Sequence, residues 1–163
     1  MALTSTITRY NENWPALFLA EQARIAEGFQ AELLAIHPVG STAVPGLAAK
    51  PEIDVLVVVS GHRDEPAKKT FMTTLGYARG SNLSEGHHFS RRDVDGVRTH
   101  KVHVCINGHP QIARMLRFRE LLRHDSAIRQ QYQALKLQLE ASNREGIGEY
   151  LAGKAPFIDE VVG

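Results

Sequence analysis

The sequence predicts an α+β fold, in which helices flank a small mixed β-sheet and further helices follow at the C-terminus. Strand-like patterns cluster in the middle of the chain, helical periodicity occurs at both ends, and no βαβ unit repeats. The length of 163 residues matches one domain of roughly 100–200 residues. We therefore expect residues 1–163 to form a single domain.

The N-terminal third is predicted to contain one helix and two strands. Asn13 and Pro15 are typical of a helix start. Residues 35–39 favour a short strand, residues 41–51 contain too much Pro and Gly for a long helix, and residues 52–60 give the clearest strand. The predicted apolar stripe of the helix consists of Leu17, Phe18, Ile25, Phe29, Leu33 and Leu34.

A β-hairpin is predicted in the second half of the chain. Residues 87–94 and 97–106 flank Asp95-Gly96, a dipeptide that favours a type I′ turn because both positions then adopt positive φ. The other predicted elements are helices over 64–75, 111–124, 127–144 and 146–161, the last of them short, and a short strand over 77–80.

Composition and charge argue against several classes of function. Nineteen Lys and Arg against 18 Asp and Glu leave a net charge of +1, which gives no electrostatic basis for tight binding to nucleic acid or anionic lipid. The single Cys105 excludes an internal disulfide and a site built from several cysteines. No apolar run approaches the roughly 20 residues of a membrane helix, and residues 1–13 lack the apolar segment of a signal peptide. We expect a cytoplasmic protein that binds no membrane.

Gly40 and Ser41 form a predicted turn directly after the first strand. Glycine lets the backbone approach a ligand closely, and the hydroxyls of Ser41 and Thr42, with neighbouring N–H groups, are typical phosphate ligands. The segment is not a Walker loop, because no Gly-Lys-Ser/Thr follows at the required spacing. It also lacks the glycine pattern of a hydrolase nucleophile elbow. Taken alone, a Gly-Ser pair after a strand is more often a simple tight turn than a phosphate site.

Two carboxylates, Glu52 and Asp54, stand at the start of the clearest strand. Side chains two residues apart on a strand leave the same face, and adjacent carboxylates repel each other unless a cation lies between them. Mg²⁺ commonly binds one or two carboxylates together with substrate phosphates. The alternative is the solvated end of a strand, in which Glu52 pairs with Lys50.

The stretch from His37 to Asp54, His-Pro-Val-Gly-Ser-Thr-Ala-Val-Pro-Gly-Leu-Ala-Ala-Lys-Pro-Glu-Ile-Asp, resembles the GrpB family, which is similar to the nucleotidyltransferase fold. In that superfamily a Gly-Ser turn leads, at about this separation, into an acid-apolar-acid strand that binds metal. The resemblance thus implies a nucleotidyltransferase-like fold with metal ligands at Glu52 and Asp54, and it suggests a role for Lys154. It extends over residues 98–104, residues 118–123, Tyr132 and Leu135-Lys136.

The histidines of the hairpin are a second group of candidate ligands. A two-residue turn places Phe89 opposite Val102 on the core face and His88 opposite His103 on the polar face. His103 occupies the position at which the resemblance implies a third acid. Imidazole is a metal ligand and a general base, although it binds Mg²⁺ less well than carboxylate does. The two histidines either bind Mn²⁺ or Zn²⁺ with Asp54 or simply cover a half-exposed sheet.

Basic side chains near a carboxylate site typically hold substrate phosphates. We expect this of Lys50 and Lys101, whereas Arg91 and Arg98 fit a solvated hairpin tip equally well. Most of the arginines on the helix over 111–124 are expected to form a solvated surface; they are Arg114, Arg117, Arg119 and Arg123.

The leading functional hypothesis is metal-dependent transfer of a nucleoside monophosphate from a nucleoside triphosphate to a small-molecule acceptor. Asp54 or His103 would take the acceptor proton, and Mg²⁺, with Mn²⁺ or Zn²⁺ as alternatives, would bind Glu52, Asp54 and His103. A non-catalytic nucleotide- or CoA-binding module and a histidine-containing metal-dependent hydrolase are the alternatives; the family is also known fused to dephospho-CoA kinase. The predicted phosphate ligands are Gly40, Ser41, Thr42, Lys50 and Lys101.

Overall fold

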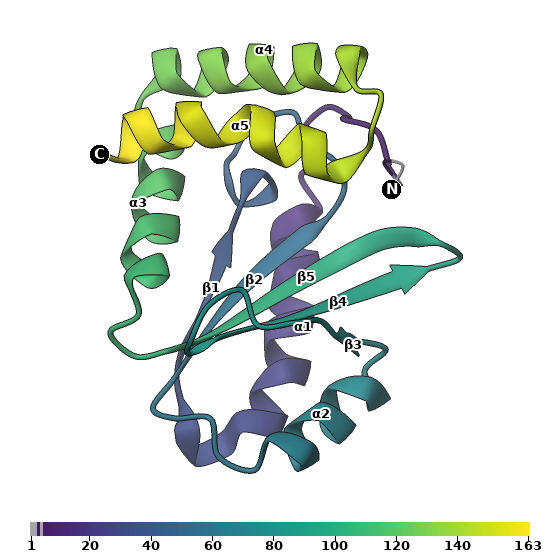
Figure 1. The fold of residues 1–163 in the computed structure, drawn as a ribbon, viewed down its shortest axis with the longest axis vertical. Helices are drawn as coiled ribbons and strands as arrows, with labels where there is room; N and C mark the ends of the chain where they lie inside the picture. The colour runs from purple at the N-terminus through teal and green to yellow at the C-terminus, as the bar shows by residue number, and fades with distance from the viewer. Residues whose placement is uncertain (1–2, 4) are drawn as a thin grey trace.

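A mixed sheet with helices on both faces organises the part of the chain that the computed structural model describes, which is residue 3 and residues 5–163 (Figure 1). Residues 1, 2 and 4, which the single-domain prediction includes, lie outside it. The strands are β1 (Leu33–Val39), β2 (Ile53–Val59), β3 (Ala78–Arg79), β4 (His87–Val94) and β5 (Val97–Ile106). Their order is β1-β2-β5-β4-β3. Only the β2–β5 pair among these strands is parallel, so the prediction of a small mixed sheet is confirmed.

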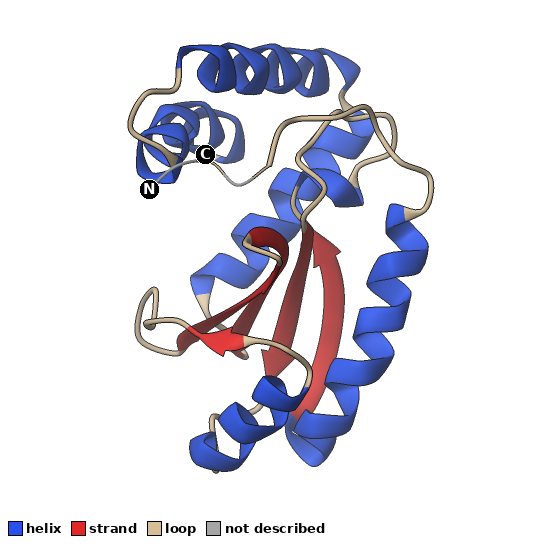
Figure 2. Ribbon diagram, turned by 90° about the vertical axis from the view of Figure 1, so that its right-hand side faces the viewer, coloured by secondary structure: helices blue, strands red, loops and turns tan. Residues whose placement is uncertain are grey.

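Helices cover the two faces of this sheet unequally. Helices α1 and α2 pack against one face and α3 against the other, whereas α4 and α5 lie side by side beyond one end of the sheet (Figures 1 and 2). The helices are α1 (Trp14–Phe29), α2 (Glu65–Thr74), α3 (Pro110–His124), α4 (Ser126–Ser142) and α5 (Ile147–Val162), with two 3-10 turns, η1 (Gln30–Glu32) and η2 (Ser41–Ala43). The segment expected as a short last helix is therefore a helix of 16 residues.

The central strand β2 is buried on both faces. Val55 and Val57 pack on the side of α1 and α2, while Leu56 and Val58 pack on the side of α3. A strand covered on both sides needs apolar residues at every position rather than at alternate ones. This explains the unbroken apolar run that marks the strand in the sequence.

The first helix ends earlier than the apolar stripe indicated. Gln30 adopts a φ of 44° and η1 follows, so Leu33 and Leu34 begin β1 and leave the helical register. Leu34 is 52% exposed, and Leu17, also expected in the core, is 49% exposed. Asn13 precedes the helix but makes no capping hydrogen bond through its side chain. The spacing of the apolar residues thus predicted a helix that is too long and a buried face that is too wide.

The hairpin has the predicted turn but a different register. Asp95 and Gly96 have φ values of 54° and 79°, as a type I′ turn requires. Beyond the turn, Arg92 pairs with His100 and Asp93 pairs with Arg98. Thr99 is therefore left without a partner in the ladder, and this β-bulge moves all later pairs by one residue.

The bulge overturns the predicted pairing of the histidines. Phe89 lies opposite His103, and His88 lies opposite Val104. Because neighbouring residues of a strand face opposite sides of the sheet, His88 and His103 point to different faces. The predicted face-to-face pair of these two histidines is wrong, and His87 takes the place of His88.

The C-terminal helices pack on the loop that follows β1. Leu122 of α3 and Tyr132 of α4 form one apolar cluster with Val44 and Leu47 of that loop. In addition, the ring of Phe157 in α5 stacks on Tyr132 with 5.6 Å between the ring centroids. This packing brings α4 and α5 to the N-terminal end of β2. Among the described helices, none is long and apolar enough to cross a membrane.

We predict that Leu56→Ala destabilises the protein by about 3 kcal/mol, because it leaves a cavity in a fully buried strand. The matched control is Leu34→Ala on the neighbouring strand, where an exposed side chain should contribute less than about 0.5 kcal/mol. Urea denaturation measures both values. Equal losses for the two variants would contradict the assignment of the core.

Candidate functional site

The Asp54 carboxylate packs directly against the backbone of Gly40. These residues meet because β1 and β2 pair antiparallel and place Val39 opposite Asp54. Gly40 has a φ of 74°, and a Cβ at this position would lie 2.1 Å from Asp54 Oδ2. Glycine is therefore required here both by conformation and by space.

Arginines of α3 hold the segments on either side of this turn. Arg119 donates a hydrogen bond to the Pro38 carbonyl at 3.0 Å, and Arg123 donates one to the Ala43 carbonyl at 2.9 Å. The exposed fractions of these side chains are 14% and 31%. The expectation that they belong to a solvated surface is wrong for both, because carbonyl groups far away in the sequence, one at the end of β1 and one just after the turn, accept their hydrogen bonds.

Hydrogen bonds also fix the hydroxyls of the turn. Thr42 is buried, and its hydroxyl donates to the Glu52 carbonyl at 3.1 Å. The Ser41 hydroxyl accepts a hydrogen bond from Lys136 Nζ at 2.9 Å. Of the two predicted hydroxyl ligands, Thr42 therefore joins the turn to the acidic segment, whereas Ser41 faces a lysine.

The parallel pairing of β2 and β5 places Lys101 beside Asp54. Lys101 Nζ lies 3.4 Å from Asp54 Oδ1, and this carboxylate raises the pKa of the lysine. Apart from this contact, the described residues offer the buried Asp54 Oδ1 no hydrogen-bond partner. Glu52 precedes the strand and shares the same cavity.

Four lysines and two carboxylates converge on one small cavity of about 90 Å³. Lys136 of α4 and Lys154 of α5 join Lys50 and Lys101, so with all four lysines protonated and both carboxylates ionised the lining carries a formal charge of +2. Such an excess of positive charge suits an anion, and a phosphate above all. The residues that line the cavity include Gly40, Ser41, Thr42, Lys50, Glu52, Asp54, Lys101, Tyr132, Lys136, Tyr150 and Lys154.

Burial makes two of these lysines easy to deprotonate. Loss of hydration and the neighbouring ammonium groups lower the pKa of Lys136 to about 7 and that of Lys154 to about 8. Lys136 Nζ donates to the Ala48 carbonyl at 2.7 Å as well as to Ser41. A bound anion would favour the charged forms and offset the cost of burying them.

The predicted site did not include Lys136 and Lys154, although the resemblance suggested a role for Lys154. The resemblance included Tyr132 and Lys136, which stand four residues apart on one face of α4. The spacing within one helix shows that they share a face, but it does not show what that face covers. Only the packing of α4 and α5 over the turn reveals the partners.

His103 lies outside this group. It pairs with Leu56 on β2, one step along the same face from the pair formed by Asp54 and Lys101. Its Nδ1 is 2.8 Å from His87 Nε2, and burial lowers its pKa to about 3. The structure therefore joins His103 to another histidine, and it does not bring it to the carboxylates or into the cavity that they line.

His87, Cys105 and His109 form a cluster whose potential ligand atoms lie within 4.8 Å of one another. His109 Nδ1 accepts the Gln111 N–H at 3.1 Å, so the ring proton is on Nε2, which is 2.8 Å from Ser84 Oγ. Burial raises the pKa of the Cys105 thiol to about 11. Hydrogen bonding within the fold thus uses both nitrogens of His109, and burial favours the protonated thiol of Cys105.

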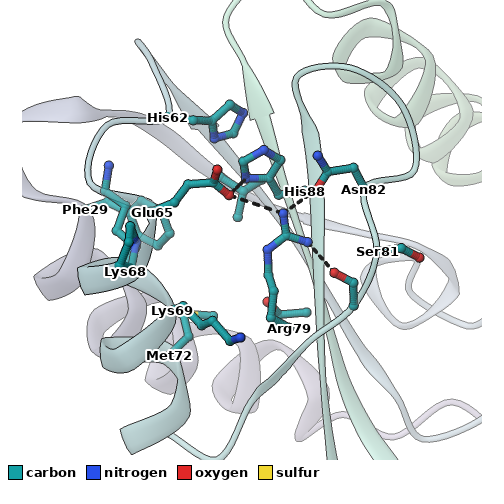
Figure 3. A pocket seen from close by; sticks show the side chains of 14 residues that line it. Phe29, His62, Glu65, Lys68, Lys69, Met72, Arg79, Ser81, Asn82 and His88 are labelled. Carbon is teal, nitrogen blue, oxygen red and sulfur yellow. Dashed lines mark hydrogen bonds and ion pairs between the residues drawn. The ribbon is translucent and has the colours of Figure 1, made fainter.

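His88 lines a larger cavity of about 620 Å³ on the opposite face of the sheet (Figure 3). Its ring stacks on His62 with 3.6 Å between centroids, and its Nδ1 lies 3.3 Å from Glu65 Oε1. Arg79 reaches the same carboxylate at 3.5 Å. Of the predicted ligands this cavity contains His88 alone, without a predicted carboxylate or phosphate ligand, so the carboxylates and lysines define the candidate site.

We predict that Gly40→Ala destabilises the protein more than Gly46→Ala does. Both residues have positive φ, which costs alanine about 1–2 kcal/mol, but nothing lies within 4 Å of a Cβ at Gly46. Overpacking against Asp54 should add about 1–3 kcal/mol for Gly40→Ala. Urea denaturation of the two variants tests this, and equal losses would show that the contact with Asp54 is unimportant.

Sulfate affinity should fall several-fold as the pH rises from about 6 to about 9. Lys136 and Lys154 lose their protons in this interval, as their lowered pKa values require, whereas the charge of sulfate stays constant. Calorimetric titration measures the affinity. Lys136→Met should weaken binding at low pH and flatten the profile, while Lys69→Met, at an exposed position outside this cavity, should change neither. An unchanged profile in Lys136→Met would contradict the role of this lysine.

Protein families provide an independent comparison. The model of the family described as GrpB protein matches residues 4–163. The UPF0157 protein YqkA of Bacillus subtilis is 37% identical over 153 residues, or 93% of this chain. The chain spans only 44% of the length of YqkA, but it covers 80% of a UPF0157 protein of Halalkalibacterium halodurans that is 34% identical over 158 residues, or 96% of this chain.

Solved structures point to the same family as the sequence matches do. The crystal structure of GrpB from Enterococcus faecalis matches with a TM-score of 0.88 and 32% identity, over 96% of this chain and 94% of that one. Cid1 poly(U) polymerase bound to MgATP matches with a TM-score of 0.58 and 9% identity, over 90% of this chain and 50% of that one; this second likeness is one of fold alone. The chain belongs to the GrpB family, and its fold is nucleotidyltransferase-like.

Proposed function

We propose that this protein transfers a nucleoside monophosphate from a nucleoside triphosphate to a small-molecule acceptor in a metal-dependent reaction. The observation that carries the proposal is the cavity that Glu52 and Asp54 line together with four lysines and with Gly40, against whose backbone the Asp54 carboxylate packs. A carboxylate pair beside a cationic phosphate pocket is the arrangement that phosphoryl chemistry requires. The fold shared with Cid1, a poly(U) polymerase, supports the same reaction class.

The lysines bind the phosphates that leave. Lys136 and Lys154 enter the cavity from α4 and α5, and Lys50 lies at its edge with its ammonium 3.7 Å from the centre of the Tyr150 ring. Their charges attract a triphosphate and stabilise the pyrophosphate as it departs. Ser41, whose hydroxyl already accepts from Lys136, contacts the same phosphate oxygens.

Glu52 and Asp54 are the residues that would hold Mg²⁺. Their oxygens are the hard donors that this ion prefers, and the buried Asp54 Oδ1 has no hydrogen-bond partner other than Lys101 among the described residues, so it retains capacity for a cation. When bound, the ion would neutralise charge on the reacting phosphate. Mn²⁺ has the same preference for oxygen, whereas a Zn²⁺ site with His103 lacks support from the geometry.

Asp54 is also the base that this arrangement offers. It lines the cavity, whereas His103, the other predicted base, is hydrogen-bonded to His87 and lies outside it. A carboxylate oxygen at the reacting centre takes the proton from the acceptor hydroxyl or amine as the new bond to phosphorus forms.

A non-catalytic nucleotide- or CoA-binding module is the second candidate. Lys101 favours it, because this lysine occupies the position on β5 that directly adjoins Asp54. Within the described lining of the cavity, Glu52 and Asp54 are the only acids. Two carboxylates with a lysine beside them on the next strand provide a phosphate pocket, but they provide fewer metal ligands than three acids would.

We predict that Asp54→Asn reduces release of pyrophosphate from ATP by about 100-fold or more, because it removes both a metal ligand and the base. The assay measures pyrophosphate with Mg²⁺ and a mixture of small alcohols and amines. Calorimetry with ATP, with and without Mg²⁺, is run on the same variant.

Asp95→Asn is the matched control, because Asp95 lies at the exposed tip of the hairpin. It should keep full activity and full affinity for ATP. If the wild type binds ATP equally well with and without Mg²⁺, and Asp54→Asn alters neither binding nor turnover, the non-catalytic module is correct and the transferase is not.

A further inference from the structure

A third cavity of about 400 Å³ adjoins the lysine cavity at Asp54. Its walls come from the first turns of α1 and from β1, and most of its lining is apolar. Thr42 and Asp54 are the two lining residues that both cavities share. The side chains that give it its character are Trp14, Phe18, Leu19, Ile36 and Pro38.

The walls of this apolar cavity are firmly held. Trp14 is 3% exposed and Phe18 is 7% exposed, and the ring of Tyr10 packs edge-on against Trp14 at 5.3 Å. Arg123 forms part of the wall and donates a hydrogen bond to the Ala43 carbonyl. A preformed apolar cavity of this volume matches the usual size of a small-molecule site.

We propose that the apolar cavity binds the acceptor, and that the acceptor is an alcohol or amine with an apolar body about the size of one or two rings. This inference rests on the proposed transferase function and names its substrate class.

The arrangement of the two cavities supports this assignment. In transfer to phosphorus, the attacking and leaving oxygens lie roughly in line on opposite sides of the reacting atom. The leaving pyrophosphate belongs with the four lysines, so the acceptor must approach from another side of Asp54. The apolar cavity is lined by that residue and carries no lysine. Its one cation, Arg123, is already engaged by the Ala43 carbonyl and by Glu120, so the mostly apolar walls suit an uncharged body better than they suit a second phosphate.

The reaction then balances as follows. The acceptor oxygen or nitrogen forms a bond to the α-phosphorus, and the bond from that phosphorus to the bridging oxygen of the β-phosphate breaks. Pyrophosphate leaves with the bonding electrons into the lysine cavity, and the acceptor proton passes to the Asp54 carboxylate.

The chain contains one tryptophan, Trp14, and it lines the apolar cavity, so its indole N–H signal reports on this site alone. The test is an NMR titration of the ¹⁵N-labelled protein with 2-phenylethanol as the probe. The indole signal of Trp14 is followed with and without Mg²⁺ and a non-hydrolysable α,β-methylene ATP. The expected result is a saturable shift of the indole signal with 2-phenylethanol that persists when the nucleotide is bound.

Leu19→Gln and Leu17→Gln form a matched pair of variants. Both leucines are exposed on α1, at 61% and 49%, so neither change threatens folding, and only Leu19 lines the cavity. Leu19→Gln should weaken 2-phenylethanol binding about tenfold through the lost apolar contact. Leu17→Gln should leave it unchanged, and both variants should keep the affinity of the wild type for the nucleotide.

Failure of this inference is distinguishable from failure of the proposed function. If 2-phenylethanol gives no saturable shift, or if the nucleotide competes with it and Leu19→Gln weakens the nucleotide, the apolar cavity is not an acceptor site, although the transferase proposal stands. If 2-phenylethanol binds as expected but no nucleotide binds in the lysine cavity, the proposed function falls and the acceptor role falls with it.

Discussion

The contact between the Asp54 carboxylate and the backbone of Gly40 sets the geometry on which the rest of the site depends. It requires a glycine at positive φ, and it follows from the antiparallel pairing of β1 with β2. Arg119 and Arg123 hold the carbonyls on either side of this turn. Strand β2 therefore holds the turn on one side and helix α3 holds it on the other. The Gly40-Ser41 dipeptide, which would be flexible by itself, is fixed in place between them.

Around this contact the molecule separates two chemical environments. Lysines from β5, α4, α5 and the loop before β2 create a cationic cavity next to Asp54, and side chains mainly from α1 and β1 create a mostly apolar cavity beside it. Burial of Lys136 and Lys154 lowers their pKa values and is costly without an anion. That cost is a physical reason for the cavity to hold phosphate rather than water.

The histidines illustrate how one residue changes an interpretation. In a regular two-residue hairpin His88 lies opposite His103. The extra residue Thr99 shifts the pairing by one residue, so these two histidines point to opposite faces of the sheet. His103 then contacts His87 and is half-buried, whereas His88 joins Glu65 on the other face. A bulge has no clear signature in composition or periodicity, so this difference was not predictable from alternation alone.

The sequence by itself determined the α+β class, the Asp95-Gly96 turn, the buried strand β2 and the spacing of Gly40, Ser41, Glu52 and Asp54. These depend on local conformational preferences and on contacts between neighbouring strands. Tertiary structure alone decided that Lys136 and Lys154 complete the cavity, that Arg119 and Arg123 donate to the carbonyls of Pro38 and Ala43, and that His103 is not among the residues that line this cavity. The reason is physical: these outcomes follow from a bulge and from the packing of α3, α4 and α5, which unite residues about 80 to 100 positions apart, beyond the reach of any local pattern.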